Sequence, residues 1–368
     1  MLAHAQNLVY NLQELMPTQY QKENLEAMLA LFLEAQGHPL PEHSKTKSAT
    51  GLSRFMNINP WSTRGLVRTT RKQTLKQVLF ESESGGKPFL QVIIDLTSLE
   101  KAGKFKKFAH LISVYNSKRG LHLVVLYLVV GKWRIPGNFR VWRGKGTTSP
   151  AQLGLKLLQR LPKSLKSNFQ VMILADTAFS SVEFLHGIRK LKLHAITGIP
   201  VNRKLVDGRV LRRLHKQGQQ IHLVGLKFPV TVSWYYLKRE KGKLEKRFVL
   251  STRPLKASTI KWWGKRRWQI EGWFKIAKHR FGLHRFGQAT LLGMYRWLIL
   301  SLTAYLIAHW TYLLTQTPPL PDWGEAAQTA RESIFPRIIV SHLLLDIDRL
   351  LPIARSCGFD INISRCKI

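Results

Sequence analysis

The segment FLQVIID, residues 89–95, is an apolar run that ends in an acidic residue. The segment FQVMILAD, residues 169–176, has the same design. Short apolar runs that are rich in Val and Ile are typical of buried strands. We therefore expect two neighbouring strands of one sheet, with Asp95 and Asp176 at their carboxyl ends.

The segments around these two runs predict an α/β protein with a mixed sheet. Apolar runs at 110–115 and 121–130 lie on either side of the turn residues 116–120 and indicate a hairpin. Together with residues 89–95 they predict a three-strand meander. The later elements alternate, as parallel strands joined by helices do, and are expected as a helix at 149–161, a strand at 169–175, a helix at 180–191 and a strand at 193–199.

Residues 201–251 interrupt this alternation with short β-like runs and predict a β-rich insertion. Helical patterning resumes at Ser258 and continues to about Leu314. Within it, residues 297–314 carry one ionisable side chain, His309, and are about as long as a short membrane span. They also contain Ser and Thr, and we interpret them as a buried core helix.

The first 80 residues are predicted to be helical. Leucines recur at helical spacing in residues 1–36, and Pro17 separates two helices. Residues 44–80 carry eight Lys or Arg and no acid, and part of this segment has cations at three- and four-residue steps. Such a row is a solvated helix face or, as we favour here, a DNA-binding one. Its members are Arg64, Arg68, Arg71, Lys72 and Lys76.

The formal net charge of +37 is concentrated in the middle of the chain. Residues 101–320 contain 42 basic and 6 acidic side chains. The hydrophobic content of 45% is that of a packed protein, which excludes a disordered basic tail. This charge implies a polyanionic partner, for which nucleic acid is the leading candidate and an anionic membrane the alternative.

Other kinds of site find no support in the sequence. The two cysteines, Cys357 and Cys366, make neither a disulfide framework nor a zinc site. There is no Walker loop and no nucleophile elbow. No signal peptide is evident, and we expect a cytoplasmic protein.

Three carboxylates stand out against the positive background. Asp95 and Asp176 follow two strands, and Glu271 lies in the aromatic, basic segment 262–278. Two such aspartates and a glutamate from a packed helix can hold two Mg²⁺ ions, which clamp the attacking and leaving oxygens of a phosphoryl transfer. Each Asp alone is an ordinary strand cap, but the three together predict a catalytic metal site.

The run RWQIEGWF, residues 267–274, resembles the C-terminal signature of bacterial insertion-sequence DDE transposases. Residues 95–97 (DLT) and 176–179 (DTAF) resemble the two other blocks of that family. The three blocks occur in the family's order, and the resemblance covers about residues 89–315.

The signature of the hairpin-forming cut-and-paste group of that family is Tyr, two residues, Arg, three residues, Glu, six residues, Lys. Arg267, Glu271 and Lys278 match this spacing. The position of the tyrosine is taken by Gly264. On a helix, Arg267 and Lys278 share a face with Glu271 and would flank a metal ligand with phosphate contacts. A simple ion pair between Arg267 and Glu271 is the structural alternative.

The resemblance implies an RNase H-like catalytic domain. It divides the chain into a helical DNA-end-binding domain at 1–86, the first part of the core at 87–200, the β-rich insertion at 201–255, the second part of the core with the Glu helix at 256–316, and a C-terminal helical tail at 317–368.

The resemblance also implies metal-dependent cleavage at element ends and strand transfer through a DNA hairpin. The cofactor would be two Mg²⁺ ions per site, with Mn²⁺ as a substitute. The partners would be double-stranded DNA, both terminal inverted repeats and target, and a second copy of the chain in a synaptic complex, at the bacterial nucleoid and without a membrane. Trp234 in the insertion is our candidate to stack a flipped base, and Lys275 is a further candidate DNA contact.

Two alternatives stay open at this stage. One is a DNA-binding protein derived from such an enzyme that no longer cleaves. The other is an RNase H-like nuclease that acts on hybrids or junctions. The three carboxylates count against the first, and the basic N-terminal helices and the insertion count against the second.

Overall fold

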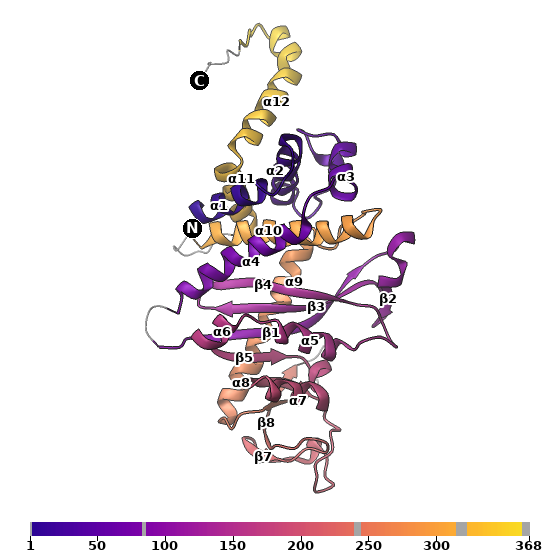
Figure 1. Cartoon of the computed structure of the whole chain (residues 1–368), viewed down its shortest axis with the longest axis vertical. Coiled ribbons are helices and arrows are strands. Elements are labelled where there is room, and N and C mark those ends of the chain that lie inside the picture. Colours follow the sequence, from indigo (N-terminus) through magenta and orange to yellow (C-terminus); the bar gives the residue numbers. More distant parts are fainter. Residues whose placement is uncertain (1, 83–85, 239–243, 314–321, 363–368) are drawn as a thin grey trace. The chain divides into compact units, whose positions relative to one another are not determined.

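The computed structural model describes residues 2–82, 86–238, 244–313 and 322–362 (Figure 1). The chain forms two compact units. One unit is continuous, Arg71–Lys278, and contains the sheet; the other combines Met1–Thr70 with His279–Ile368. The centre of the expected linker, residues 83–85, and the expected boundary at 316/317 lie outside the described residues.

Within the described residues, nine strands form one mixed sheet in the order β2-β3-β1-β5-β6-β9-β8-β7, and β4 also pairs with β3. β1 (Phe89–Glu100), β3 (Lys118–Val130) and β4 (Trp133–Trp142) form an antiparallel meander. β5 (Gln170–Ala175) and β6 (His194–Ile199) run parallel to β1. The order β4-β3-β1-β5-β6 is that of an RNase H-like sheet, which confirms the expected fold class.

The structure corrects the make-up of the meander. The run expected at 110–115 is the short strand β2 (Ile112–Tyr115), which pairs with the start of β3 through a two-residue turn. The third strand of the meander is β4, which the sequence did not predict. Pro136 and Gly137 interrupt the β4 pattern, and most β4 side chains are only half-buried. β4 pairs with β3 alone among the described strands, and an edge strand tolerates both features.

β1 is longer than expected and corrects the position of Asp95. The strand continues for five residues beyond Asp95, because these residues stay paired with β3 as far as Glu100↔Gly120. The neighbour β5 ends at Ala175, which pairs with Ile94. Asp95 therefore lies inside β1, at the level where β5 ends.

The insertion extends the main sheet. β9 (Leu244–Ser251) pairs antiparallel with β6, and β8 (Val230–Lys238) joins β9 to β7 (Gln219–Ile221). One face of these strands contributes to a buried apolar cluster with Leu185, Ile199 and Leu211, and the strand residues in that cluster are Ile221, Val230, Val232, Trp234, Phe248 and Leu250.

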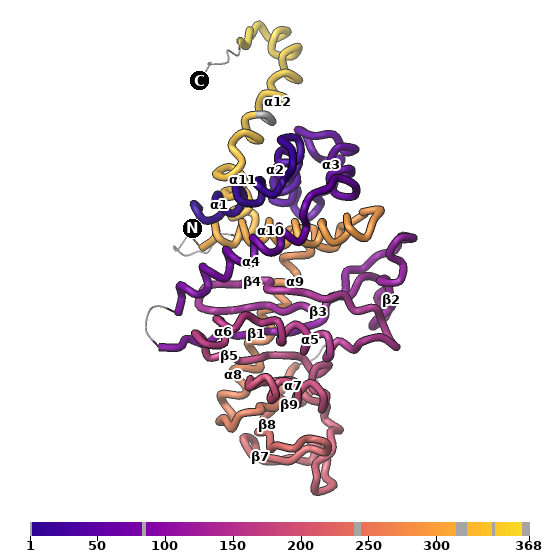
Figure 2. The backbone as a smooth tube through the Cα atoms, viewed as in Figure 1, coloured from indigo at the N-terminus to yellow at the C-terminus, as the bar shows by residue number. Residues whose placement is uncertain are grey.

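Helices complete the unit that contains the sheet (Figure 2). Ser149 starts the first with a capping box, in which its Oγ accepts a hydrogen bond from the backbone of Gln152. The segment expected as one helix around Glu271 is two helices, because Arg267 and Trp268 separate them. The helices are α5 (Pro150–Gln159), α6 (Lys163–Asn168), α7 (Val182–Lys190), α8 (Ala257–Arg266) and α9 (Gln269–His279). A further helix, α4 (Thr63–Phe80), contains the boundary between the two units, which falls after Thr70.

The other unit is helical in its described part and unites the two ends of the chain. Its helices are α1 (Leu2–Gln13), α2 (Gln19–Glu34), α3 (Ala49–Asn57), α10 (Leu291–Tyr312), α11 (Trp323–Ile334) and α12 (Pro336–Ser356). The sequence placed these ends in separate segments, but α10 packs against α1, α2, α3 and α11 alike. By length and composition α10 could cross a membrane, yet most of it is buried inside this unit, as in a core helix.

Candidate active site

Asp95 and Asp176 are neighbours on adjacent strands. β1 and β5 run parallel and in register up to Ile94 and Ala175, so that the two aspartates are the next residues on each side. Adjacent strands lie about 4.8 Å apart, and residues in parallel register project from the same face of a sheet. The equivalent positions that the sequence predicted for these aspartates are confirmed.

α9 brings the third carboxylate to this place. Gln269, the first residue of α9, donates a hydrogen bond of 3.1 Å to the side chain of Gln91 on β1. Glu271 lies in the first turn of α9, where the helix dipole favours a negative charge. Two residues before the helix, Arg267 contacts Asp95 of the same strand. α9 therefore starts beside β1, with Glu271 turned to the two aspartates. Asp95, Asp176 and Glu271 together form the acidic edge.

Arg267 joins two of the three carboxylates. Its Nη1 donates to Oδ2 of Asp95 at 2.8 Å, and its Nη2 donates to Oε1 of Glu271 at 2.7 Å. The Arg267 side chain is 13% exposed. The ion pair with Glu271, which was the structural alternative for these residues, is thus present. Arg267 is the counter-ion of the acidic edge in this state of the protein.

Burial dominates the electrostatics of Asp95. The pKa of Asp95 is raised to about 7, chiefly by burial and to a smaller extent by the charges of Asp176 and Glu271, against the opposing effect of Arg267. For Arg267, burial alone would lower the pKa, but the three carboxylates outweigh it and raise that pKa. The positive charge of Arg267 therefore does not offset the effect of burial on Asp95.

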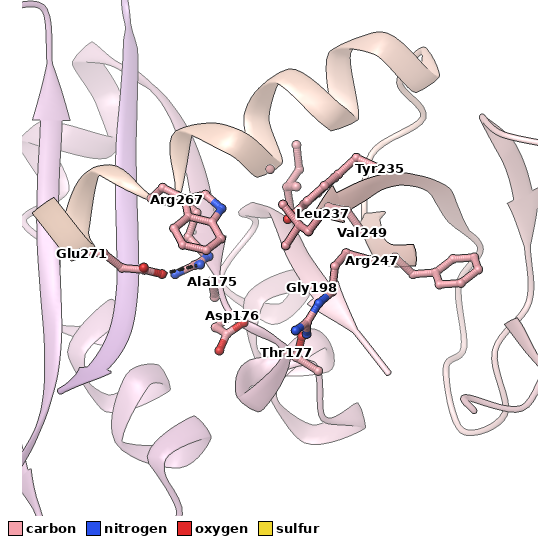
Figure 3. Close-up of a pocket in the computed structure, with 14 residues that line it drawn as sticks. Ala175, Asp176, Thr177, Gly198, Tyr235, Leu237, Arg247, Val249, Arg267 and Glu271 are labelled. Atoms are coloured by element: carbon pink, nitrogen blue, oxygen red, sulfur yellow. Dashed lines mark hydrogen bonds and ion pairs between the residues drawn. The ribbon is translucent and has the colours of Figure 1, made fainter. Parts of the chain in front are cut away.

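A pocket of about 230 Å³ opens beside the carboxylates (Figure 3). Asp176, Arg267 and Glu271 form one side of it. Tyr235 and Arg247 from the insertion form the other side. The remaining lining residues are Ala175, Thr177, Ile196, Gly198, Leu237, Phe248, Val249, Gly264 and Trp268. The pocket therefore connects the acidic edge to the inserted strands.

The chemistry of the three carboxylates fits a divalent cation. They supply oxygen ligands, which Mg²⁺ prefers, and the buried charge of Asp95 calls for a cation. Their arrangement is not assembled for one, since among the described residues no three Asp, Glu, His or Cys side chains come close enough to hold a metal. Arg267 separates Asp95 from Glu271, and it must move away before both can bind one ion.

The two candidate lysines of α9 lie apart from this cluster. Lys278 is seven residues beyond Glu271, about 10 Å along the helix. Burial lowers the pKa of Lys278, Lys118 lowers it further, and Glu100 partly opposes both. Lys278 is therefore close to the far end of β1. Lys275 is exposed one helical turn beyond Glu271.

The structure corrects the candidate for base stacking. Trp234 is 5% exposed and belongs to the apolar cluster of the insertion. The ammonium group of Lys246 lies 3.9 Å from the centre of its ring and covers one face. The exposed tryptophan at the pocket is Trp268, which is 44% exposed and lies in the connection between α8 and α9.

The cations that were predicted for an N-terminal helix face lie on α4. Arg64, Arg68, Arg71 and Lys72 are all exposed, whereas Leu66 and Val78 on the same helix are buried. The helix is therefore amphipathic in the predicted sense. Its exposed face carries no acid.

Two residues at the pocket were not singled out from the sequence: Tyr235 and Arg247. A signal existed for the first, because the alternation Val230, Val232, Trp234 assigns Trp234 to the apolar face of β8 and Tyr235 to the opposite face. Arg247 and Tyr235 are a cross-strand pair, but this pairing needs the register of β8 and β9, which no local pattern reveals.

A mixed sheet in the RNase H-like strand order, with an acidic pair at adjacent strands and a glutamate on a packed helix, defines an RNase H-like protein. The family described as transposase DDE domain matches residues 87–307. This match covers more than half of the chain, so the protein belongs to the DDE transposase family, and it is a transposase that acts on DNA.

Among solved structures, the chain is similar to the piggyBac transposase in a synaptic complex with hairpin DNA. The two chains are 14% identical, the similarity covers 95% of this chain and 78% of that chain, and the TM-score is 0.48. A comparison with curated protein sequences gave no match.

Proposed function

We propose that this transposase cuts and rejoins DNA by metal-dependent phosphoryl transfer at Asp95, Asp176 and Glu271. The observation that carries the proposal is the parallel register of β1 and β5, which makes the two aspartates neighbours. Glu271 completes the set from α9 and shares Arg267 with Asp95.

The three carboxylates would hold Mg²⁺, or Mn²⁺ in its place, as two ions. When bound, these ions polarise the phosphate and lower the pKa of the attacking water or of the terminal 3′-hydroxyl. Asp95 would offer its carboxylate oxygens from β1, and Asp176 would offer its own from the residue after β5. Glu271 would supply its oxygens from the first turn of α9. Arg267 would leave Asp95 and turn to a DNA phosphate, so that the same guanidinium neutralises carboxylates before DNA arrives and phosphate afterwards.

The DNA would follow the basic surface. Arg267 and Trp268 would contact it at the pocket, with Trp268 in place of Trp234 as the exposed aromatic side chain for an unpaired base. Lys275 and Lys278 would contact the backbone farther along α9, and the cations of α4 would bind the element end. We also propose a cut-and-paste reaction with a hairpin intermediate and a synaptic dimer. The signature of Arg267, Glu271 and Lys278 supports these steps.

Alanine at each carboxylate tests this proposal. We expect Asp95→Ala, Asp176→Ala and Glu271→Ala each to lower Mg²⁺-dependent cleavage of a duplex with the element end by at least about 10³-fold, since each removes a metal ligand. Binding of the same duplex should persist. The matched control is Asp207→Ala, an exposed aspartate paired with Arg209 in a turn.

The outcomes separate the alternatives. A variant of the three that cleaves like the native protein would refute the assignment of that carboxylate. End binding without any cleavage by the native protein would favour the non-catalytic DNA-binding protein. Degradation of RNA–DNA hybrids without end preference would favour the nuclease.

A further inference from the structure

The wall of the pocket that the insertion supplies has no part in the metal chemistry proposed above. Tyr235 on β8 and Arg247 on β9 are directly opposite each other in the antiparallel ladder. Cross-strand partners project from the same face of a sheet. Both line the pocket that also contains Asp176, Glu271 and Arg267, so a phenol and a guanidinium face the acidic edge together.

The alternation along β8 turns Tyr235 to the pocket. Trp234 lies in the apolar cluster on one face of the strand, and Tyr235, the next residue, lies on the other. Tyr236 is 57% exposed and is not among the pocket residues. The chain thus offers two adjacent tyrosines of which one reaches the site, as Figure 3 shows for Tyr235.

Gly264 of α8 lies against this tyrosine. A Cβ atom at Gly264 of α8 would lie 3.3 Å from Cγ2 of Val249 and 3.8 Å from Cε1 of Tyr235. The ring of Tyr235 therefore packs against the helix at the one position where α8 has no side chain. Gly264 is also the place at which the resembling transposases have a tyrosine, so here the β-insertion brings a tyrosine ring to that point from the other side.

The polar end of Tyr235 is available for a ligand. Among the described residues no protein group forms a hydrogen bond with its hydroxyl. Arg247 is held in place by Glu245, with Nε 2.9 Å from Oε1 and Nη2 3.1 Å from Oε2, and its side chain is 46% exposed. A hydroxyl donor in the same pocket as Arg247 and Arg267 suits an anion with several acceptor oxygens.

We propose that Tyr235 is a DNA-contacting residue of this transposase, whose hydroxyl donates a hydrogen bond to a backbone phosphate adjacent to the scissile one. The inference rests on the proposed function, because that function places the scissile phosphate at the carboxylates on the opposite wall. Arg247, which is paired with Glu245, lies on the same wall and offers a guanidinium beside the hydroxyl. The insertion then fixes the register of the DNA strand while the carboxylates act on it.

The test compares Tyr235→Phe with Tyr236→Phe. Both remove one hydroxyl from neighbouring positions of β8, and neither alters the apolar cluster. We expect Tyr235→Phe to lower kcat/KM for Mg²⁺-dependent cleavage of an element-end duplex by about tenfold or more, the loss of one hydrogen bond to a charged group. Tyr236→Phe should cleave like the native protein. Thermal melting should be the same for all three, which excludes a purely structural role.

A cycle with modified DNA identifies the contact. A single methylphosphonate, placed in turn at each phosphate around the cleavage point, removes one acceptor charge. At the phosphate that Tyr235 contacts, the substitution should slow the native protein but have a clearly smaller effect on Tyr235→Phe. Unchanged cleavage by Tyr235→Phe, or independent effects at every phosphate, would overturn the inference.

These results separate the inference from the function on which it rests. Failure of the native protein to cleave with Mg²⁺, or full activity of Asp95→Ala, would refute the proposed function. Cleavage that requires Asp95 but not the Tyr235 hydroxyl would leave that function intact and refute the role of Tyr235 alone.

Discussion

Asp95 is a carboxyl group whose burial works against the stability of its own fold. Its pKa is 3.8 in an ordinary setting and about 7 in the folded protein, first of all because of burial. A carboxyl group whose pKa rises on folding destabilises the protein once it is ionised. The stability associated with the neutral form is complete below about pH 4 and is lost as the pH rises to 7. A bound cation would remove this conflict.

The first prediction follows at this residue. In the absence of divalent metal, Asp95→Asn should be more stable than the native protein at pH 8, by up to about 4 kcal/mol, because it removes the ionised form. The gain should shrink at pH 5, as measured by urea unfolding in EDTA. Asp207→Asn, at an exposed position, is the control. A less stable Asp95→Asn at pH 8 would show that the pairing with Arg267 outweighs burial.

Single residues were predictable where a local pattern reports directly on position. Asp95 and Asp176 each follow an apolar run, and that pattern was enough to make them neighbours in the sheet. The double contact of Arg267 was only half visible. Its i,i+4 relation to Glu271 is local, whereas its bond to Asp95 joins residues 172 positions apart, and no short-range pattern contains it.

At the scale of one element, two tryptophans differ in their surroundings. Trp234 on β8 is buried in the apolar cluster, and Trp268 in the α8–α9 connection is exposed. Trp234→Ala should lower the free energy of unfolding by roughly 3 to 5 kcal/mol, because it leaves a cavity in the apolar cluster. Trp268→Ala should leave stability nearly unchanged and weaken binding of hairpin DNA. Chemical unfolding and fluorescence anisotropy measure the two effects. Normal stability of Trp234→Ala would contradict its assignment to the core.

Arg296 on α10 fixes the connection between α3 and α4. It is 1% exposed, and its guanidinium donates to the carbonyl oxygens of Phe55, Met56, Asn59 and Trp61 at 2.8–3.1 Å, while its Nε donates to Thr63. It also stacks 3.8 Å from the ring centre of Trp61. Burial lowers the pKa of Arg296 to about 10, but the group stays charged at neutral pH. One arginine thus holds the loop that leads into the basic helix.

Arg296→Lys should therefore be severely destabilising although it keeps the charge. A lysine has one nitrogen and cannot serve five acceptors, so several buried carbonyl groups would lose their partners. We expect a loss of about 2 to 4 kcal/mol in urea unfolding. Arg285→Lys, at an exposed position in the same unit, should change little. Equal stability of these two variants would mean that water replaces the guanidinium in this loop.

Elements were predictable in proportion to how regular their patterns are. The buried strands and the capped helix at Ser149 follow simple periodicity. β4 does not, because an edge strand tolerates Pro136 and half-buried side chains. The break between α8 and α9 is also invisible to periodicity, since Arg267 keeps helical backbone angles at φ −54° and ψ −33°. Tertiary contacts decide both cases.

At the scale of the whole molecule, the order of segments along the chain differs from their grouping in space. The sequence divides the chain into consecutive parts. In the structure, the helical unit combines the first 70 residues of the chain with those from His279 onward. α10 explains this grouping. It is apolar on all sides and needs partners from both ends of the chain, α1, α2 and α3 before the sheet and α11 after it.

Fragments of the chain test this grouping. Residues 71–278 retain every strand of the sheet and both helices beside the site, so this fragment should be soluble and unfold in one urea transition. Residues 87–307, the extent of the family match, end inside α10 and lack all four helices that cover it. This fragment should aggregate through its exposed apolar surface in size-exclusion chromatography. An aggregated 71–278 beside a monomeric 87–307 would show that the sheet, and not α10, depends on the missing helices.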